Sequence, residues 1–188
     1  MSTQANPDTA HPKDSASQAS SVGSHASFSP GSSTVPDAGS AYFDSRETRS
    51  AEQREASLFA ALPAFIAYAK AHAPAWAKRL QAFDAQSIHS RKALAALPVL
   101  RKSDLKDLQS IDPPFGGFNA TPVGKMSRLF MSPGPIMDPE GTGADPWRAG
   151  RALWAAGIRP GMILQNCFGY HLTPGAWMVD AEIGRAHV

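Results

Sequence analysis

The stretch from Arg128 to Trp177, RLFMSPGPIMDPEGTGADPWRAGRALWAAGIRPGMILQNCFGYHLTPGAW, carries the strongest fold signal in the chain. It predicts a strand, a Pro/Gly-rich loop, a helix, a buried strand and a second loop. For the helix, Asp145 can act as the N-cap, Pro146 suits the first position and Gly157 can end it. The run Met162–Phe168 is apolar with little alternation, which is typical of a strand covered on both faces. Proteins of the α/β class use this order to hold an anionic ligand beside a helix N-terminus.

The charge balance argues against binding to nucleic acid or to a membrane surface. The 188 residues include 18 Lys and Arg against 16 Asp and Glu, which gives a formal net charge of +2. Cys167 is the single cysteine, so no internal disulfide can form, and its place in the apolar run predicts a buried side chain. No apolar run approaches the ~20 residues that a membrane span needs, and the N-terminus has no secretory signal. We therefore expect a cytoplasmic protein.

The composition divides the chain into three segments. Residues 1–40 are rich in Ser, Ala, Pro and Gly, and they have too few apolar side chains to offset the entropy of folding, so we predict a disordered leader. Residues 41–181 carry the helix and strand patterns. The last residues, Glu182–Val188, can be encoded by GAG ATC GGA AGA GCA CAC GTC, which matches the start of a common sequencing-library adapter. We interpret 182–188 as a translated adapter artefact and the chain as the N-terminal fragment of a longer protein.

The first ordered element is predicted to be a long helix. Ser50 and Gln53 have the spacing of a capping box, in which each side chain bonds to the other residue's backbone N–H. Pro63 should bend or split this helix, and Pro74 should end it. The helix is amphipathic, and its apolar face consists of Leu58, Phe59, Leu62, Phe65, Ile66 and Ala69.

Shorter elements are predicted between this helix and the stretch quoted first. A short helix contains Trp76, and Ser90 opens another helical turn or two. Ser103 is expected to cap a further helix, and Asp112–Gly117 to form a turn. A strand is expected around Met126–Met131.

Four segments of the chain carry a family resemblance. They are YFDSRETRS (Tyr42–Ser50), LPVLRKSDL (Leu97–Leu105), PPFGG (Pro113–Gly117) and AAGIRPGMILQNCFGY (Ala155–Tyr170). Together they resemble the N-terminal part of the phenylacetate–coenzyme A ligase family, within the superfamily of AMP-forming acyl-CoA synthetases. The resemblance implies an α/β fold in which N-terminal helices are followed by the start of a helix-flanked sheet. The sheet is incomplete, because the resemblance covers only the first part of such an enzyme.

The resemblance also implies an activity for the intact protein. It would use ATP, with Mg²⁺, to convert an aromatic or other carboxylic acid into an acyl-adenylate, and would then transfer the acyl group to coenzyme A. The fragment itself is expected to be inactive, since it lacks the rest of the adenylation domain and the mobile C-terminal domain. The partner is then a small-molecule carboxylic acid, and a homodimer is left open.

The family's phosphate loop has the form Ser-Ser-Gly-Thr-Thr-Gly-Lys-Pro-Thr, and Ser132–Glu140 stands in its place. Ser132, Gly134 and Pro139 match the pattern, whereas the Thr pair, the second Gly and the Lys do not. The Lys position holds Asp138. A carboxylate about 4 Å from a phosphate near the surface repels it by roughly 4 kcal/mol at an effective dielectric of about 20.

The prolines of this segment lack the backbone N–H groups with which such a loop holds phosphate. Lys125 and Arg128, just upstream, are possible substitutes for the missing lysine, and Mg²⁺ could bridge Asp138 to the phosphates. The resemblance therefore implies a nucleotide site built from Ser132, Gly134, Lys125 and Arg128.

The loop after the predicted buried strand is the candidate acid site, because open α/β sheets bind ligands at the carboxyl ends of strands. By the resemblance this loop lines the acyl pocket, with Tyr170, His171 and Gly175 as candidate contacts. The alternative for His171 is a loop histidine hydrogen-bonded to backbone. No Cys/His spacing fits a zinc site, and the sequence assigns no catalytic residue.

Four side chains of the predicted helix are given structural roles. Trp147 and Trp154 are expected to pack against neighbouring elements, and Arg148 and Arg151 to be solvated, with a position facing the phosphates as the open alternative. Two hypotheses for the whole protein stay open. One is an acid–CoA ligase with a reworked phosphate loop, and the other is a degenerate homologue that binds an acyl or aryl acid, or a protein, without ATP chemistry.

Overall fold

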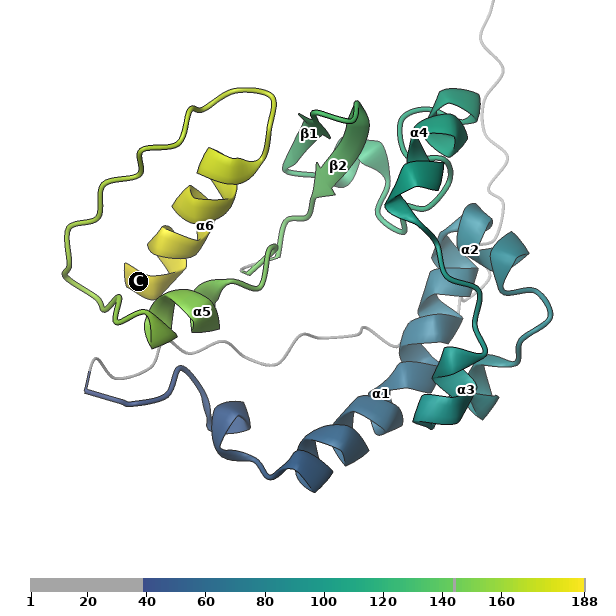
Figure 1. Cartoon of the computed structure of the whole chain (residues 1–188), viewed down its shortest axis with the longest axis horizontal. Coiled ribbons are helices and arrows are strands. Elements are labelled where there is room, and N and C mark those ends of the chain that lie inside the picture. The colour runs from purple at the N-terminus through teal and green to yellow at the C-terminus, as the bar shows by residue number, and fades with distance from the viewer. Residues whose placement is uncertain (1–38, 144, 188) are drawn as a thin grey trace, which may run out of the picture. The chain divides into compact units, whose positions relative to one another are not determined.

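The computed structural model describes residues 39–143 and 145–187 (Figure 1). All of them lie in the second of the two units into which the chain divides, Ser33–Val188. The disordered leader predicted for residues 1–40 lies almost wholly outside the described residues. Helices come first and a two-stranded sheet follows, as predicted for an incomplete α/β fold. The elements are η1 (Ser45–Thr48), α1 (Ala51–His72), α2 (Pro74–Arg79), η2 (Ala85–Ser87), α3 (Arg91–Ala95), α4 (Lys102–Ile111), η3 (Val123–Lys125), β1 (Arg128–Ser132), β2 (Ile136–Glu140), α5 (Gly150–Ala155) and α6 (Gly175–His187).

Helix α1 begins as the sequence predicts. The Gln53 N–H donates to Ser50 Oγ at 3.2 Å, and the Ser50 N–H donates to Gln53 Oε1 at 2.9 Å, which completes the capping box. Pro63 lies inside one continuous helix, so of the predicted bend or split the split does not occur; the cap at the start and the buried Ile66 beyond the proline hold the helix on both sides. The predicted apolar face is only partly buried, since Phe65 is 53% exposed.

A small core forms where α1, α2 and η2 meet. Its fully buried members are Ile66, Leu80, Ala85 and Ile88. Pro74 ends α1 and opens α2, where a proline is favoured because its missing N–H would have no helical partner. This core is built from segments close in sequence.

Serine caps were predicted for the next two helices, and only the first is present. Ser90 caps α3 as predicted, with its Oγ accepting from the Ala93 N–H at 3.2 Å. Ser103 does not cap α4, because that helix already begins at Lys102 and Ser103 falls in its first turn. The predicted turn Asp112–Gly117 is present and ends in two glycines with positive φ.

The segment expected to be the phosphate loop is a β-hairpin. The predicted strand is found as β1, which pairs with β2 in antiparallel register, Ser132 opposite Ile136 and Arg128 opposite Glu140. The second half of the predicted loop is therefore a strand. This strand was not predicted, because Pro139 argues against a strand. In the structure Pro139 lies opposite Leu129 in β2, an edge strand, where a proline is tolerated.

Helix α5 is shorter than predicted. It begins at Gly150 rather than at Pro146, because Arg148 has a φ of 58°, a left-handed conformation that no helix continues through. Its end is as predicted, since Gly157 follows it with a φ of 93°. Trp154 is buried, as expected for a packing residue.

The predicted buried strand Met162–Phe168 is wrong. The segment has no regular structure, Ile163 is fully exposed at 100%, and Cys167 is exposed rather than buried. A strand needs a neighbour to accept its backbone hydrogen bonds, and no strand in the described part of the chain pairs with this one.

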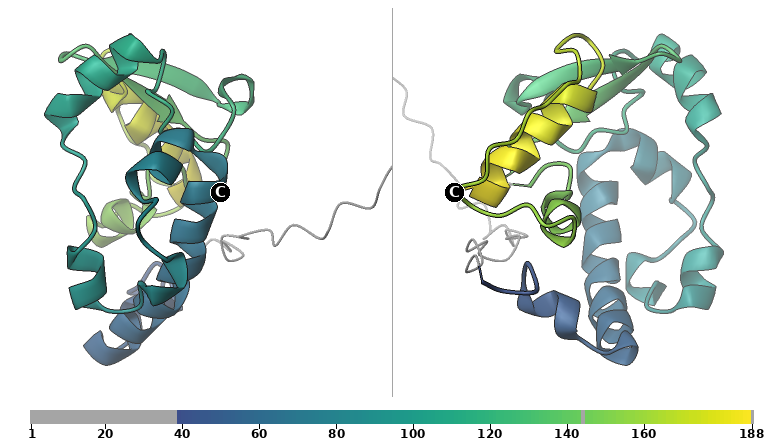
Figure 2. Two further views of the ribbon diagram at one scale, coloured as in Figure 1. Left: turned by 90° about the vertical axis from the view of Figure 1, so that its right-hand side faces the viewer. Right: turned by 60° about the vertical axis from the view of Figure 1, so that its left-hand side comes forward.

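Helix α6 was not predicted. It follows the loop that begins after Phe168 and continues to His187, so the segment assigned to the adapter, 182–188, forms its last turns as far as the structure describes them. That assignment stays a prediction. The helix and the loop before it lie beside the hairpin (Figure 2), where the Met131 N–H donates to the Leu172 carbonyl at 3.0 Å.

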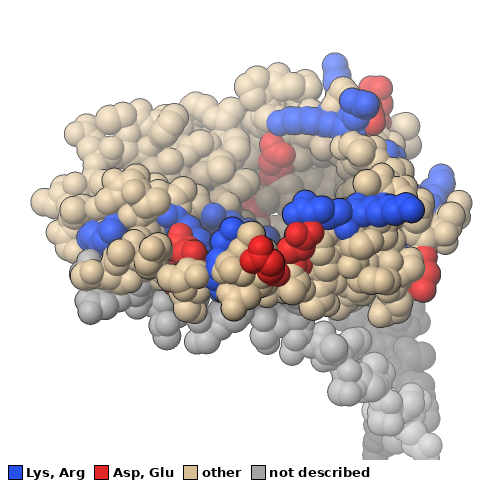
Figure 3. All heavy atoms as spheres, turned by 60° about the horizontal axis from the view of Figure 1, so that its bottom comes forward, with Lys and Arg blue, Asp and Glu red and all other residues tan. Residues whose placement is uncertain are grey.

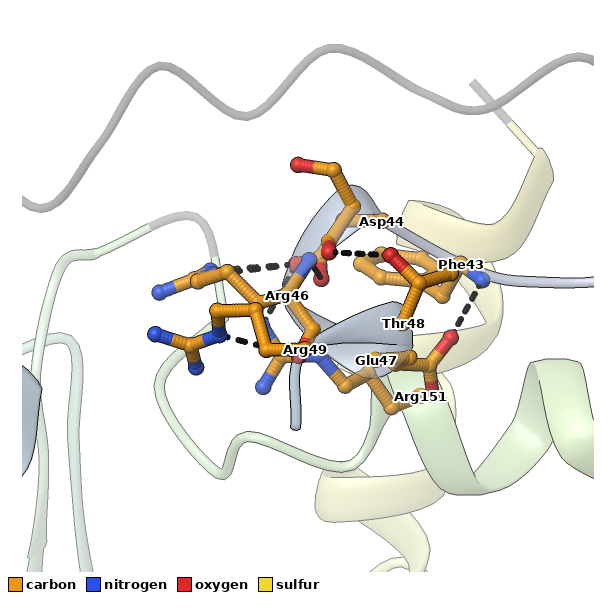
Figure 4. A network of polar contacts seen from close by, with 8 residues as sticks. Phe43, Asp44, Arg46, Glu47, Thr48, Arg49 and Arg151 are labelled. Atoms are coloured by element: carbon orange, nitrogen blue, oxygen red, sulfur yellow. Dashed lines mark hydrogen bonds and ion pairs between the residues drawn. The ribbon is translucent and has the colours of Figure 1, made fainter. Parts of the chain in front are cut away.

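The segment Tyr42–Ser50 is held against α5 by a polar network (Figure 4). Asp44 accepts hydrogen bonds from the Arg46 N–H and from the guanidinium of Arg151, so Arg151 is partly exposed and paired with Asp44 rather than only solvated. Partial burial acts to raise the pKa of Asp44, but the bonds from Arg151 and Arg46 outweigh it and hold that pKa below its ordinary value. Beside them, Phe43 meets the Trp154 ring edge-on at 6.0 Å.

The face drawn in Figure 3 carries interspersed basic and acidic side chains, separated by wide uncharged areas. Within the described ranges, no helix has the length and hydropathy to cross a membrane.

Candidate functional site

The hairpin turn Pro133–Pro135 stands where the phosphate loop is expected. Gly134 is the only one of its residues with a backbone N–H, since both neighbours are prolines. The hydroxyl of Ser132 donates to the Ile136 carbonyl at 3.2 Å, which closes the turn. The turn is exposed and offers a ligand one N–H group and one hydroxyl that is already engaged.

Arg128 and Lys125 lie far from this turn along β1. Arg128 is the first residue of the strand and Ser132 the last, so their Cα atoms are separated by on the order of 13 Å. Lys125 precedes the strand and is exposed. The two expected halves of the nucleotide site, the turn and the basic residues, are therefore at opposite ends of one strand.

Arg128 is also engaged with the protein itself. Its guanidinium pairs with Glu140, whose side chain is 3% exposed, and lies 4.6 Å from the centre of the Trp177 ring. The indole Nε1 of Trp147 donates to the other Glu140 oxygen at 3.3 Å. Because an unpaired buried carboxylate is costly, the first role of Arg128 is to neutralise Glu140.

Asp138 holds the position of the lysine in the family's phosphate-loop pattern. It lies in β2, opposite Phe130, and not on the turn. Asp138 is therefore a strand residue and not one of the turn residues Pro133–Pro135.

The candidate acid-binding residues gather on one loop. The Tyr170 hydroxyl donates to Asp180 Oδ1 at 3.1 Å and accepts from Asn166 Nδ2 at 3.1 Å. The ring of Tyr170 meets Trp177 edge-on, with centroids 5.0 Å apart. Gly175 is the first residue of α6.

His171 is held within its own loop. Its Nδ1 accepts from the Thr173 N–H at 3.3 Å and is 3.0 Å from the Thr173 hydroxyl, and its carbonyl accepts from Trp177 Nε1 at 3.2 Å. This is the arrangement of the alternative weighed from sequence, a loop histidine bonded to backbone. The Nε2 atom is the one left to meet a substrate.

The structure brings the hairpin and this loop together. The Met131 N–H, next to Ser132, donates to the Leu172 carbonyl, next to His171. The segment of Ser132 therefore lies beside the loop of Tyr170 and His171. The guanidinium of Arg128, from the other end of β1, reaches the same loop through Trp177, whose ring also meets Tyr170. Sequence analysis missed three residues that contact Tyr170. Trp177 and Asp180 lie on α6, which was not predicted, and Asn166 lies in the segment predicted to be a buried strand.

The turn offers few groups that could hold a triphosphate. The turn supplies one N–H at Gly134, and the arginine expected to assist is paired with Glu140. Nor do the residues that the structure describes include a cluster of His, Cys, Asp or Glu able to hold a metal ion. Phosphate binding by these residues alone would be weak.

Comparison with protein-family models and with curated protein sequences finds no match. Solved structures do match. Over 81% of this chain, the fold superimposes on 2-hydroxyisobutyryl-CoA ligase in the postadenylation state in complex with 2-HIB-AMP, with a TM-score of 0.74 and 27% identity. The same ligase with 2-HIB-AMP and CoA in the thioesterification state gives a TM-score of 0.73 and 26% identity.

The chain spans 34% of the length of these two ligase chains and 37% of a third, in an open conformation. The likeness supports the resemblance at the level of the adenylate-forming CoA ligase superfamily, and the α/β fold corresponds to a partial fragment of such a ligase. It does not single out phenylacetate–CoA ligase.

Proposed function

We propose that this chain is the N-terminal part of an AMP-forming acid–CoA ligase. The observation that carries the proposal is the match over 81% of the chain, at 27% identity, to a solved ligase that holds an acyl-adenylate. In the proposed reaction, a carboxylate displaces pyrophosphate from ATP to give acyl-AMP. The thiol of coenzyme A then displaces AMP to give the thioester.

The acid is proposed to be aromatic and to bind beside Tyr170. The support is the edge-on pair of Tyr170 and Trp177, which presents aromatic surface beside the guanidinium of Arg128. His171 and Gly175 are the further acid contacts, and Ser132 and Gly134, with Lys125 and Arg128, the nucleotide contacts. Use of Mg²⁺ with ATP, a cytoplasmic location and a homodimer complete the proposal.

The test uses the polypeptide that the natural reading frame encodes. Purified protein is incubated with ATP, Mg²⁺, CoA and one acid at a time, including phenylacetate and 2-hydroxyisobutyrate, and acyl-CoA is measured by mass spectrometry. We expect acid-dependent thioester and AMP, with the highest kcat/KM for an aromatic acid. Thioester from a hydroxy acid alone would reject the aromatic substrate but keep the ligase, and no thioester or acyl-AMP from any acid would reject both.

The second candidate is a binding protein without ATP chemistry. It is favoured by the turn, where Pro133 and Pro135 leave only Gly134 to donate an N–H to phosphate. In that case calorimetry would detect acid binding that ATP neither requires nor changes. A ligase instead shows ATP binding, because adenylation needs both substrates on the protein together.

A further inference from the structure

The side chain of Gln109, which belongs to none of the sequence motifs, forms two hydrogen bonds with the hairpin. Gln109 lies on α4 and is 8% exposed. Its Nε2 donates to the Met137 carbonyl at 2.9 Å, and its Oε1 accepts from the Met137 N–H at 2.8 Å. The amide thus pairs with β2 as a neighbouring strand would, through one donor and one acceptor.

This contact continues across the hairpin. Met137 is opposite Met131 in the register, and in an antiparallel pair the N–H and C=O of one residue point to the same edge. Those of Met137 point outward to Gln109, so those of Met131 point outward on the other side, where its N–H donates to the Leu172 carbonyl at 3.0 Å. A row of backbone and side-chain contacts therefore runs from Gln109 on α4, through Met137 in β2 and Met131 in β1, to the loop that carries Tyr170.

The row lies one residue pair from the turn. Ser132 and Ile136, which close the turn, are the next pair along the register. At this level Gln109 bonds both backbone groups of Met137, and the Leu172 carbonyl accepts from the N–H of Met131. A shift of Met137 would therefore disturb both the turn, one residue pair away, and the bond from Met131 to Leu172 that joins the hairpin to the loop.

We propose that Gln109 is a positioning residue, which fixes the hairpin turn and the Tyr170 loop relative to each other. Its consequence for catalysis rests on the proposed function, whereas its effect on the hairpin does not. Glutamine suits the task because its planar amide carries a donor and an acceptor and is long enough to reach β2. A carboxylate at position 109 keeps only the acceptor, and a thioether of similar size keeps neither bond.

The first test measures amide hydrogen exchange by NMR on the 188-residue chain. The variants are Gln109→Met and Gln109→Glu, with the exposed Gln86→Met as the matched control. In Gln109→Met we expect the Met137 amide to exchange about tenfold faster, and the Met131 amide to follow, while the Ile66 amide in α1 is unchanged. Gln109→Glu should accelerate Met137 less, since its N–H keeps an acceptor.

Two results would overturn the proposal. One is an unchanged Met137 amide in Gln109→Met. The other is an equal acceleration at Ile66, which would mean that the substitution only lowers global stability. If Gln109→Met does not fold, Gln109→Glu decides by the same comparison of Met137 with Ile66.

The second test uses the ligase polypeptide. For Gln109→Glu we expect kcat for acyl-AMP formation to fall about tenfold with little change in KM for the acid, because a displaced turn misaligns bound reactants more than it weakens binding. An unchanged kcat in an active enzyme would reject the catalytic consequence. An inactive wild type would reject the proposed function instead, and the exchange experiment would still decide the role of Gln109.

Discussion

The helical region 50–111 and the region 150–187 differ in how well their apolar side chains are covered by neighbouring elements. In the first, α1, α2 and η2 enclose Ile66, Leu80 and Ile88 with side chains from nearby in the chain. In the second, Met162–Phe168 is as apolar as a buried strand but stays exposed, and α5 and α6 are its sequence neighbours. An apolar segment is therefore buried only where other elements of the chain cover it, as α2 and η2 cover Ile66.

The largest expected effect tests whether the second region is loosely packed throughout. Trp154 is 1% exposed, meets Phe43 edge-on, stacks under Arg159 at 4.0 Å, and donates from Nε1 to the Ser40 carbonyl. Trp154→Ala should lower the free energy of unfolding by about 3–5 kcal/mol, measured by urea denaturation. Trp154→Phe keeps an aromatic ring for Phe43 and should lose less. Equal losses for the two would show that the ring contact contributes nothing.

The second prediction compares one residue type in both regions. Ile66 is 4% exposed and Ile163 is 100% exposed. Ile66→Ala should cost about 2–4 kcal/mol of unfolding free energy, because it leaves a cavity in the core. Ile163→Ala should change it by less than about 0.5 kcal/mol. A large loss at Ile163 would mean that Met162–Phe168 is covered in solution and would end the contrast between the regions.

These differences explain how much the sequence could reveal. Ser50, Gln53 and Ser90 signal helix starts through bonds to residues three positions away, so the pattern suffices. The start of α5 depends on the left-handed Arg148, which no sequence rule marks. Gln109 has no signal at all, because its partner Met137 is far away in the chain and was expected in a loop.

The candidate site divides in the same way. The sequence located the loop of Tyr170 and His171 and the segment of Ser132 and Gly134, and the structure brings the two together. It could not show that Arg128 is committed to the buried Glu140, since that pairing depends on the register of β1 and β2.

A smaller loss of stability is expected when the capping box of α1 is removed. Ser50→Ala removes the acceptor of the Gln53 N–H and should lower the unfolding free energy by about 1 kcal/mol. Ser57→Ala, at an exposed position within the same helix, is the matched control and should be neutral or slightly stabilising, because alanine has the highest helix propensity. The two variants are compared by thermal unfolding followed by circular dichroism. Equal changes would show that the capping box does not stabilise α1.

The smallest effect concerns the contact between Tyr42–Ser50 and α5, and it depends on pH. The side chains of Asp44 and Arg151 are 25% and 41% exposed, so Asp44→Asn should cost only about 0.2–1 kcal/mol near neutral pH. The folded pKa of Asp44 lies below its ordinary value of about 3.9. The carboxylate's contribution is therefore complete above that value and is lost as the pH falls through the folded pKa.

The difference between wild type and Asp44→Asn should accordingly be constant from pH 7 down to about 5 and should disappear in acid below about 3.9. Asp84→Asn is the control, because Asp84 caps η2 through the Gln86 N–H just as Asp44 caps η1. Asparagine preserves both caps, so the control isolates the ion pairs that the Asp44 carboxylate forms with Arg151 and with Arg46. A pH-independent difference for Asp44→Asn, or the same profile for Asp84→Asn, would show that the ion pairs of Asp44 do not stabilise the fold.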